Sequence, residues 1–161
     1  MSKTELAYLL KKLNIDINKV KSDNEEGMEE RIRLQKIVYF AKILGAHFNY
    51  NHSLYLHGPY SQRLARDYYS LSQEDIIKSP TSRDIDNILP RIEEIYQKDT
   101  IWLETAATLI NVKINNRRLS WNQIKDHVYD IKHDILFRGN KNRKYVDTVF
   151  EDLKQLNLIS N

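Results

Sequence analysis

The stretch Arg33-Leu34-Gln35-Lys36-Ile37-Val38-Tyr39-Phe40-Ala41 lies in the segment that decides the fold. From residue 28 to residue 44 the apolar side chains begin as a stripe at helical spacing and then cover most of the circumference. Gly45 follows at the position where helices commonly end. The pattern predicts a central helix over residues 28–44 that is buried on nearly every side.

Two short segments rich in aromatic residues follow this helix. Residues 47–50 and 53–57 have the composition of strands and are separated by Asn51-His52. They predict a small two-stranded β-hairpin, which Gly58-Pro59 is expected to end.

Helical spacing of apolar residues recurs through the rest of the chain. It predicts helices over residues 3–13, after the N-cap Ser61, around 85–96, from 100 to Asn115, after the capping box that begins at Ser120, and over about 146–156. Pro90 either kinks its helix or starts a new one. Residues 14–27 form a connector or a short strand around Ile15 and Ile17. The expected fold is mainly α, with about seven helices and a minor hairpin.

Composition limits the protein class. The chain has 161 residues, of which 41% are hydrophobic and 29% charged, as in one globular domain spanning residues 1–161. With no cysteine, disulfide scaffolds, thiol nucleophiles, iron–sulfur clusters and Cys-type zinc sites are excluded. The longest nearly apolar run, residues 37–44, is far too short to span a bilayer, and no signal peptide is recognisable. We therefore expect a cytoplasmic protein that does not enter a membrane.

No motif points to catalysis or to a cofactor. The nucleotide-binding, nucleophile-elbow and zinc-protease motifs are absent from the sequence. His47, His52 and His57 are spaced by five residues, whereas side chains on one face of a strand differ by an even number. We expect neither a metal site nor a cofactor. A dispersed catalytic triad leaves no local signature, so an enzyme stays a third hypothesis.

Tyrosines are dense around the predicted hairpin. Tyrosine is enriched at recognition surfaces, but its ring also caps mixed cores, and both interpretations stay open. The candidate partner-binding residues are Tyr50, Tyr55, His57, Gly58, Pro59 and Tyr60.

Two basic loops flank predicted helices in the C-terminal third. They suggest an alternative, a DNA-binding transcriptional regulator with a helix-turn-helix-like element. The candidate nucleic-acid contacts are Arg117, Arg118, Arg138, Lys141, Arg143 and Lys144.

The stretch quoted first, together with Leu56-His57-Gly58-Pro59-Tyr60-Ser61 and the following Leu64, resembles a known family. It is similar to the Panacea-type (SocA-like) antitoxin domain and to a related group of uncharacterised prokaryotic helical proteins, over about residues 28–71. The resemblance implies a non-catalytic module that acts by binding a partner protein, which is a toxin in the case of an antitoxin.

By position, Gln35, Lys36 and Tyr39 carry the family signature on the helix, as does the segment 57–60 in the turn. We expect Gly58-Pro59 to form a rigid turn, Tyr39 to pack beneath it and Gln35 to hydrogen-bond its backbone. The motif is structural or contacts the partner directly. The leading hypothesis is a protein-interaction module, antitoxin-like or adaptor-like, whose oligomeric state the sequence leaves open.

Overall fold

The computed structural model describes residues 2–160. Within that range the chain forms ten helices and one two-stranded antiparallel sheet, which confirms a mainly α fold with a minor hairpin. The helices are α1 (Ser2–Lys12), α2 (Ile17–Lys21), α3 (Glu25–Ile43), α4 (Gln62–Ser70), α5 (Gln73–Ile77), α6 (Arg83–Tyr96), α7 (Thr100–Asn115), α8 (Trp121–Ile131), α9 (His133–Arg138) and α10 (Arg143–Gln155). The strands are β1 (Ser53–Tyr55) and β2 (Gly58–Tyr60).

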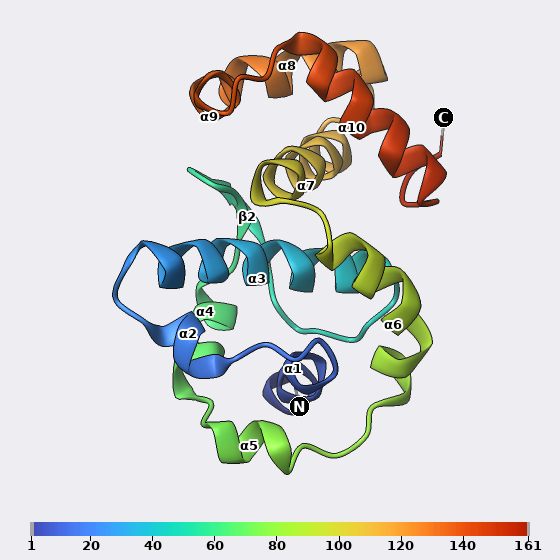
Figure 1. The fold of residues 1–161 in the computed structure, drawn as a ribbon. Helices are drawn as coiled ribbons and strands as arrows, with labels where there is room; N and C mark the ends of the chain where they lie inside the picture. The colour runs from blue at the N-terminus through green and yellow to red at the C-terminus, as the bar shows by residue number, and fades with distance from the viewer. Residues whose placement is uncertain (1, 161) are drawn as a thin grey trace.

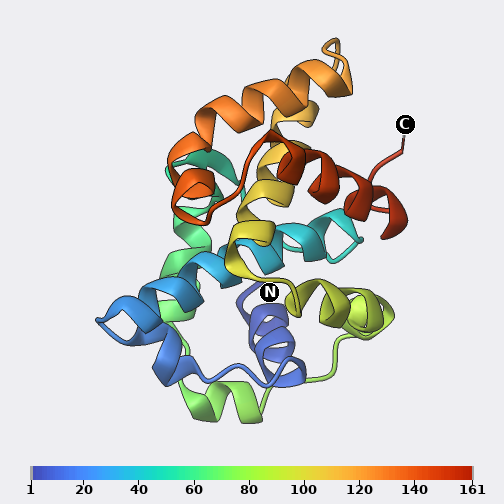
Figure 2. The ribbon, with the colours of Figure 1, turned by 45° about the horizontal axis from the view of Figure 1, so that its top comes forward.

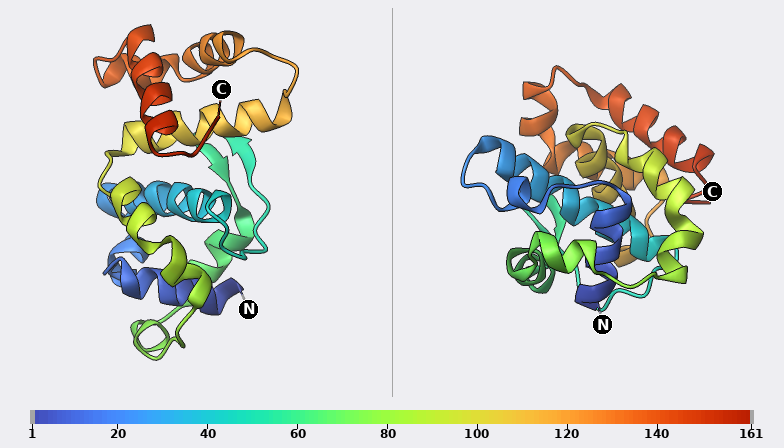
Figure 3. Two further views of the ribbon diagram at one scale, coloured as in Figure 1. Left: turned by 90° about the vertical axis from the view of Figure 1, so that its right-hand side faces the viewer. Right: turned by 60° about the horizontal axis from the view of Figure 1, so that its bottom comes forward.

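The helices are stacked in layers around α3 (Figures 1 and 3). On one side, α3 packs against α2, α4 and α6, with α1 and α5 beyond them. On the other side it packs against α7, which is covered in turn by α8 and α10. Strand β2 contacts both α3 and α7. The hairpin is therefore held by the two most central helices.

Helix α3 is buried as predicted. Every residue from 34 to 41 is buried, because other elements cover the helix on several sides. Asn24 caps its first turn by accepting a hydrogen bond from the Gly27 N–H at 2.7 Å. Gly45 follows the last turn with φ +113°, a left-handed conformation that suits glycine.

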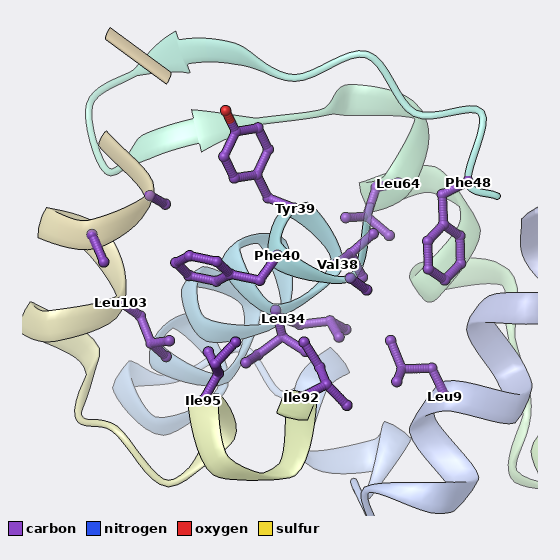
Figure 4. Close-up of a cluster of buried hydrophobic side chains, with 14 of the residues drawn as sticks. Leu9, Leu34, Val38, Tyr39, Phe40, Phe48, Leu64, Ile92, Ile95 and Leu103 are labelled. Carbon is purple, nitrogen blue, oxygen red and sulfur yellow. The ribbon is translucent and has the colours of Figure 1, made fainter. Parts of the chain in front are cut away.

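The hydrophobic core lies around α3 and includes side chains from α1, α4, α6 and α7. Figure 4 shows Leu9 of α1, Leu64 of α4 and Ile92 of α6 directed toward α3, while Leu103 of α7 approaches it from another side. All four side chains are fully buried. Full burial of one such side chain contributes about 1.5–3 kcal/mol to the hydrophobic term of folding.

The hairpin lies later in the chain than predicted. Residues 47–50 do not form a strand, and the predicted second strand is largely β1. Gly58 and Pro59 begin β2 instead of ending the hairpin, with Leu54 opposite Pro59. A two-stranded sheet consists of edge strands only, so a proline without an N–H is tolerated there.

The described part of the structure has three helices more than the expected seven, and these are α2, α5 and α9. Neither a strand nor an irregular connector lies around Ile17, because α2 buries Ile17 and Val20 one helical turn apart. Helix α5 is a short addition after α4. Helix α6 continues through Pro90, which settles the alternative of two helices.

The helix predicted after Ser120 is divided at Lys132 into α8 and α9. The capping box at its start is confirmed, since the Ser120 and Gln123 side chains each accept from the other residue's N–H. Lys132 has φ −105° and ψ 11°, and its side chain is buried against the hairpin.

No described helix combines the length and the apolar composition that are needed to cross a bilayer.

Candidate functional site

Gln35 of α3 anchors the segment 57–61, which contains β2, through the backbone of Ser61. The Gln35 amide donates to the Ser61 carbonyl oxygen and accepts from the Ser61 N–H, both at 2.9 Å. Ser61 also caps α4 by accepting from the Leu64 N–H at 3.2 Å. The expected hydrogen bonding of Gln35 to the turn backbone and the expected cap are both confirmed.

A buried lysine makes the second anchor. The Lys36 ammonium donates to the Pro59 carbonyl oxygen at 3.1 Å. Burial lowers the pKa of Lys36 to about 7, although the nearby Glu104 carboxylate acts in the opposite direction. Beside it, Gly58 has φ +91°, and a Cβ atom there would lie 3.0 Å from the Thr108 hydroxyl oxygen. Only glycine fits this close approach without strain.

Glu104 of α7 forms the centre of a charged cluster behind the hairpin tip. Its carboxylate lies 3.2 Å from His57 Nδ1 and 3.7 Å from Lys132 Nζ, and it is 1% exposed. Lys132 also donates to the Leu56 carbonyl oxygen at 2.9 Å. The cluster therefore ties the turn between β1 and β2 to α7 and to the junction of α8 and α9.

Tyr39 lies beneath the strands, as expected, and points toward them from α3 (Figure 4). Its hydroxyl accepts from the Asn111 amide at 3.3 Å, and its ring meets the edge of the His52 ring with centroids 5.1 Å apart. Burial lowers the pKa of His52 to about 3, with a further contribution from the charge of Lys42. This histidine is therefore neutral at pH 7.

A pocket of about 320 Å³ opens between α3, α4 and the hairpin. Four large apolar or aromatic side chains at it are exposed, with Leu56 at the hairpin tip 84% exposed and Tyr55 52% exposed. The ring of Tyr55 meets the Tyr60 ring edge-on, with centroids 5.5 Å apart. The lining residues are Met28, Arg31, Ile32, Gln35, Lys36, Tyr55, Leu56, His57, Tyr60, Tyr68 and Tyr69.

The structure distributes the predicted partner-binding residues unequally. Tyr55, His57 and Tyr60 line the pocket, whereas Gly58 and Pro59 are buried below it. Tyr50 lies in the core, where its hydroxyl donates to Asp67 at 2.6 Å and its ring stacks on Phe48. Tyr50 therefore does not belong to the pocket surface. The sequence did not reveal this, because the density of tyrosines does not tell which rings face inward.

Sequence reasoning missed six of the residues that line the pocket, namely Met28, Arg31, Ile32, Leu56, Tyr68 and Tyr69. Met28 lies on α3 and Tyr69 on α4, and Leu56 was placed within a strand rather than in the exposed turn. Glu104 and Lys132 were also missed. A carboxylate within the apolar run of α7 was the one available signal for Glu104.

The two basic loops are not brought together. Helix α8 separates Arg117 and Arg118 from the segment 138–144, and its 11 residues rise about 16 Å along the axis (Figure 2). Arg143 is paired with Asp126 at 2.9 Å and with Asp147 at 2.8 Å. Arg138 and Lys144 are exposed, and Lys141 lies over the Tyr145 ring, 4.9 Å from its centroid.

The evenly spaced histidines occupy separate surroundings. His47 pairs with Asp84, His52 lies against Tyr39, and His57 pairs with Glu104. Within residues 2–160 there is no group of three or more His, Asp or Glu side chains arranged to hold a metal ion.

Comparison of the chain with protein-family models, with curated proteins and with solved structures finds no match.

Proposed function

We propose that this chain is a protein-interaction module, antitoxin-like or adaptor-like, that binds a partner protein through the pocket between α3, α4 and the hairpin. The observation that carries the proposal is Leu56, an exposed apolar side chain beside a pocket with Met28, Tyr55 and Tyr69 at its rim. Apolar groups gathered at one hollow are typical of interaction sites, and Met and Tyr are enriched at protein interfaces.

The anchoring of the hairpin supports this assignment. Gln35, Lys36 and Lys132 all hydrogen-bond backbone carbonyl groups of the segment 56–61. These bonds restrain the backbone on both sides of the turn before any partner arrives. A preorganised surface loses less conformational entropy on binding, so more of its contact energy appears as affinity.

Affinity capture tests the proposal. The tagged full chain is incubated with nuclease-treated lysate of its source cells, beside the variants Leu56→Ser and Tyr69→Ser. The control is Ile77→Ser, which changes a 62% exposed residue on α5, outside the pocket. We expect the wild type and the control to retain one protein in stoichiometric amount, and the two pocket variants to retain at least tenfold less.

Two results would contradict the proposal. Retention of the same protein by all variants would place its binding site elsewhere on the molecule. Recovery of nucleic acid from untreated lysate, with no stoichiometric protein after nuclease treatment, would favour the DNA-binding alternative and its basic loops.

The captured protein separates an antitoxin from an adaptor. For an antitoxin, expression of the partner alone arrests growth, and co-expression of the wild-type chain, but not of Leu56→Ser, restores it. For an adaptor, the partner does not inhibit growth, and the complex contains a further protein.

A further inference from the structure

The charged residues that line the pocket are all basic. Among its described lining residues, Arg31 and Lys36 are basic and none is Asp or Glu. A neighbouring hollow shares Tyr55 and Tyr60 with the pocket, and its one charged lining residue in the described chain is Arg63. The surface on both sides of these two tyrosines is therefore basic.

Three carboxylates on the helices around this surface have partners within the protein. Glu104 is buried behind the hairpin with His57 and Lys132. Glu29 of α3 accepts a hydrogen bond from the Thr100 hydroxyl of α7 at 2.9 Å. Asp67 of α4 accepts from the hydroxyl of Tyr50. Glu104 therefore acts on Lys36 from behind the pocket and is not one of the residues that line it.

Lys36 has unused donor capacity. An ammonium group has three N–H donors, and within the described chain that of Lys36 makes one hydrogen bond, to Pro59. The side chain is 1% exposed, so water does not solvate it freely. Such a group gains stabilisation when an anion approaches.

Arg31 adds a second positive charge on the same wall. Its Nη1 donates to the carbonyl oxygens of Val20 at 2.8 Å and Ser22 at 2.7 Å, which holds the guanidinium in place. The guanidinium also lies over the Tyr69 ring, 5.9 Å from its centroid. Arg31 therefore places a positive charge beside the aromatic ring of Tyr69 in the pocket.

We propose that the pocket binds an acidic segment of the partner protein, in which an apolar side chain enters between Tyr55, Leu56 and Tyr69 and an adjacent Asp or Glu faces Arg31 and Lys36. The volume of about 320 Å³ is at the lower end of the range of about 300–1,000 Å³ for ligand pockets, which suits a short peptide segment. This inference rests on the proposed function and specifies its partner.

Peptide selection on the full chain identifies the preferred chemistry. A random heptapeptide phage library is selected on the immobilised wild type after depletion on Leu56→Ser. We expect a consensus with one large apolar residue next to Asp or Glu. The consensus is then synthesised beside a version in which each Asp or Glu is replaced by Asn or Gln, and we expect at least tenfold weaker binding of this amide version.

A matched pair of variants assigns the charge effect to Lys36. Lys36→Met removes the charge and keeps most of the length of the side chain. Lys42→Met makes the same change on α3, at a part-buried lysine that donates to the Tyr50 carbonyl oxygen outside the pocket. The preference for the acidic peptide should shrink at least fivefold in Lys36→Met and persist in Lys42→Met.

The pH dependence of wild-type binding supplies a test that needs no variant. Because the pKa of Lys36 is about 7, a bound carboxylate should make the protein take up a proton above that pH. Affinity for the acidic peptide should therefore fall between pH 7 and pH 9, by up to about tenfold per pH unit. The amide version should show a smaller change.

The failures of the two proposals are distinguishable. A neutral or basic consensus that still requires Leu56 would overturn the acidic-segment inference and leave the interaction module intact. Absence of any peptide that distinguishes the wild type from Leu56→Ser would also overturn the inference, and the lysate capture then decides separately whether the module itself fails.

Discussion

Gln35 and Ser61 are joined by two hydrogen bonds across 26 positions of the chain, and each bond is 2.9 Å long. The side-chain amide of Gln35 replaces the partner that the Ser61 backbone would otherwise need inside the protein. Through this pair the central helix α3 sets the position at which β2 ends and α4 begins.

Replacement of Gln35 by leucine should destabilise the fold. It leaves the buried N–H of Ser61 without a partner, whereas the Ser61 carbonyl oxygen still accepts from the Ala65 N–H at 3.2 Å. One unsatisfied buried group costs about 1–3 kcal/mol. We expect the free energy of unfolding, measured with urea, to fall by about 1–3 kcal/mol. The exposed Gln62→Leu serves as control and should change it by less than about 0.5 kcal/mol. Equal effects at the two positions would contradict the anchoring role.

Alanine substitutions at Gly58 and Gly45 should distinguish the cost of backbone strain from the cost of steric crowding. Both have positive φ, but a Cβ atom at Gly58 would lie 3.2 Å from Lys36 Cε, whereas one at Gly45 would have no neighbour within 4 Å. Gly45→Ala should therefore cost about 1–2 kcal/mol from strain alone. Gly58→Ala should cost about 1–3 kcal/mol more, from overpacking. Similar denaturation midpoints for the two variants would show that the hairpin adapts to the added methyl group.

Glu104 and Lys132 should be energetically coupled. Removal of one member of a buried charge pair leaves the other uncompensated, at a cost of about 3–5 kcal/mol. We expect Glu104→Gln and Lys132→Met each to destabilise the protein strongly, and the double variant to be less destabilised than the sum of the two. A double-mutant cycle measures this difference. Additivity within about 0.5 kcal/mol would mean that the pair does not interact.

The pH dependence of stability should reveal His52. Its pKa is about 3 in the folded protein and about 6.5 in the unfolded chain, so unfolding takes up a proton between these values. Stability should accordingly fall as pH decreases from about 6.5, by up to about 1.4 kcal/mol per pH unit for one proton. His52→Phe should reduce this slope between pH 4.5 and pH 6.5 in urea titrations.

His47 provides a control of opposite sign. The hydrogen bond to Asp84 raises the pKa of His47, so its contribution is complete below about 6.5 and is lost as pH rises through the folded value. His47→Gln should therefore lower stability by a constant amount below about pH 6.5, and this effect should disappear as pH rises through the folded pKa of His47. Equal slopes of unfolding free energy against pH for His52→Phe and the wild type, between pH 4.5 and pH 6.5, would mean that His52 is not buried in its neutral form.

Local patterns were sufficient for much of the fold. The all-round apolar character of α3, Gly45 after its end and the caps Ser61 and Ser120 were all predictable. Each depends on neighbours within about five residues, which the sequence displays directly. The hairpin register was not predictable in this way, because it depends on how β2 packs against α3 and α7.

The site was only partly predictable for the same reason. Tyr55, His57 and Tyr60 were identified from an aromatic cluster close in sequence, and they do line one pocket. Tyr50 belongs to the same cluster by position but lies in the core. Only its contacts with Phe48 and Asp67, made through the folded chain, distinguish it from the others.

By itself the sequence determined the helical class, the central helix and the residues that cap and end the elements around it, since short-range hydrogen bonding and apolar periodicity act locally. Tertiary structure decided which charges meet and which apolar groups stay exposed. Lys36, Glu104 and Lys132 come from three separate parts of the chain, and they meet only because α7 packs against both α3 and α8. Leu56 is left exposed because the carbonyl groups around it, and not its side chain, are bound to that cluster.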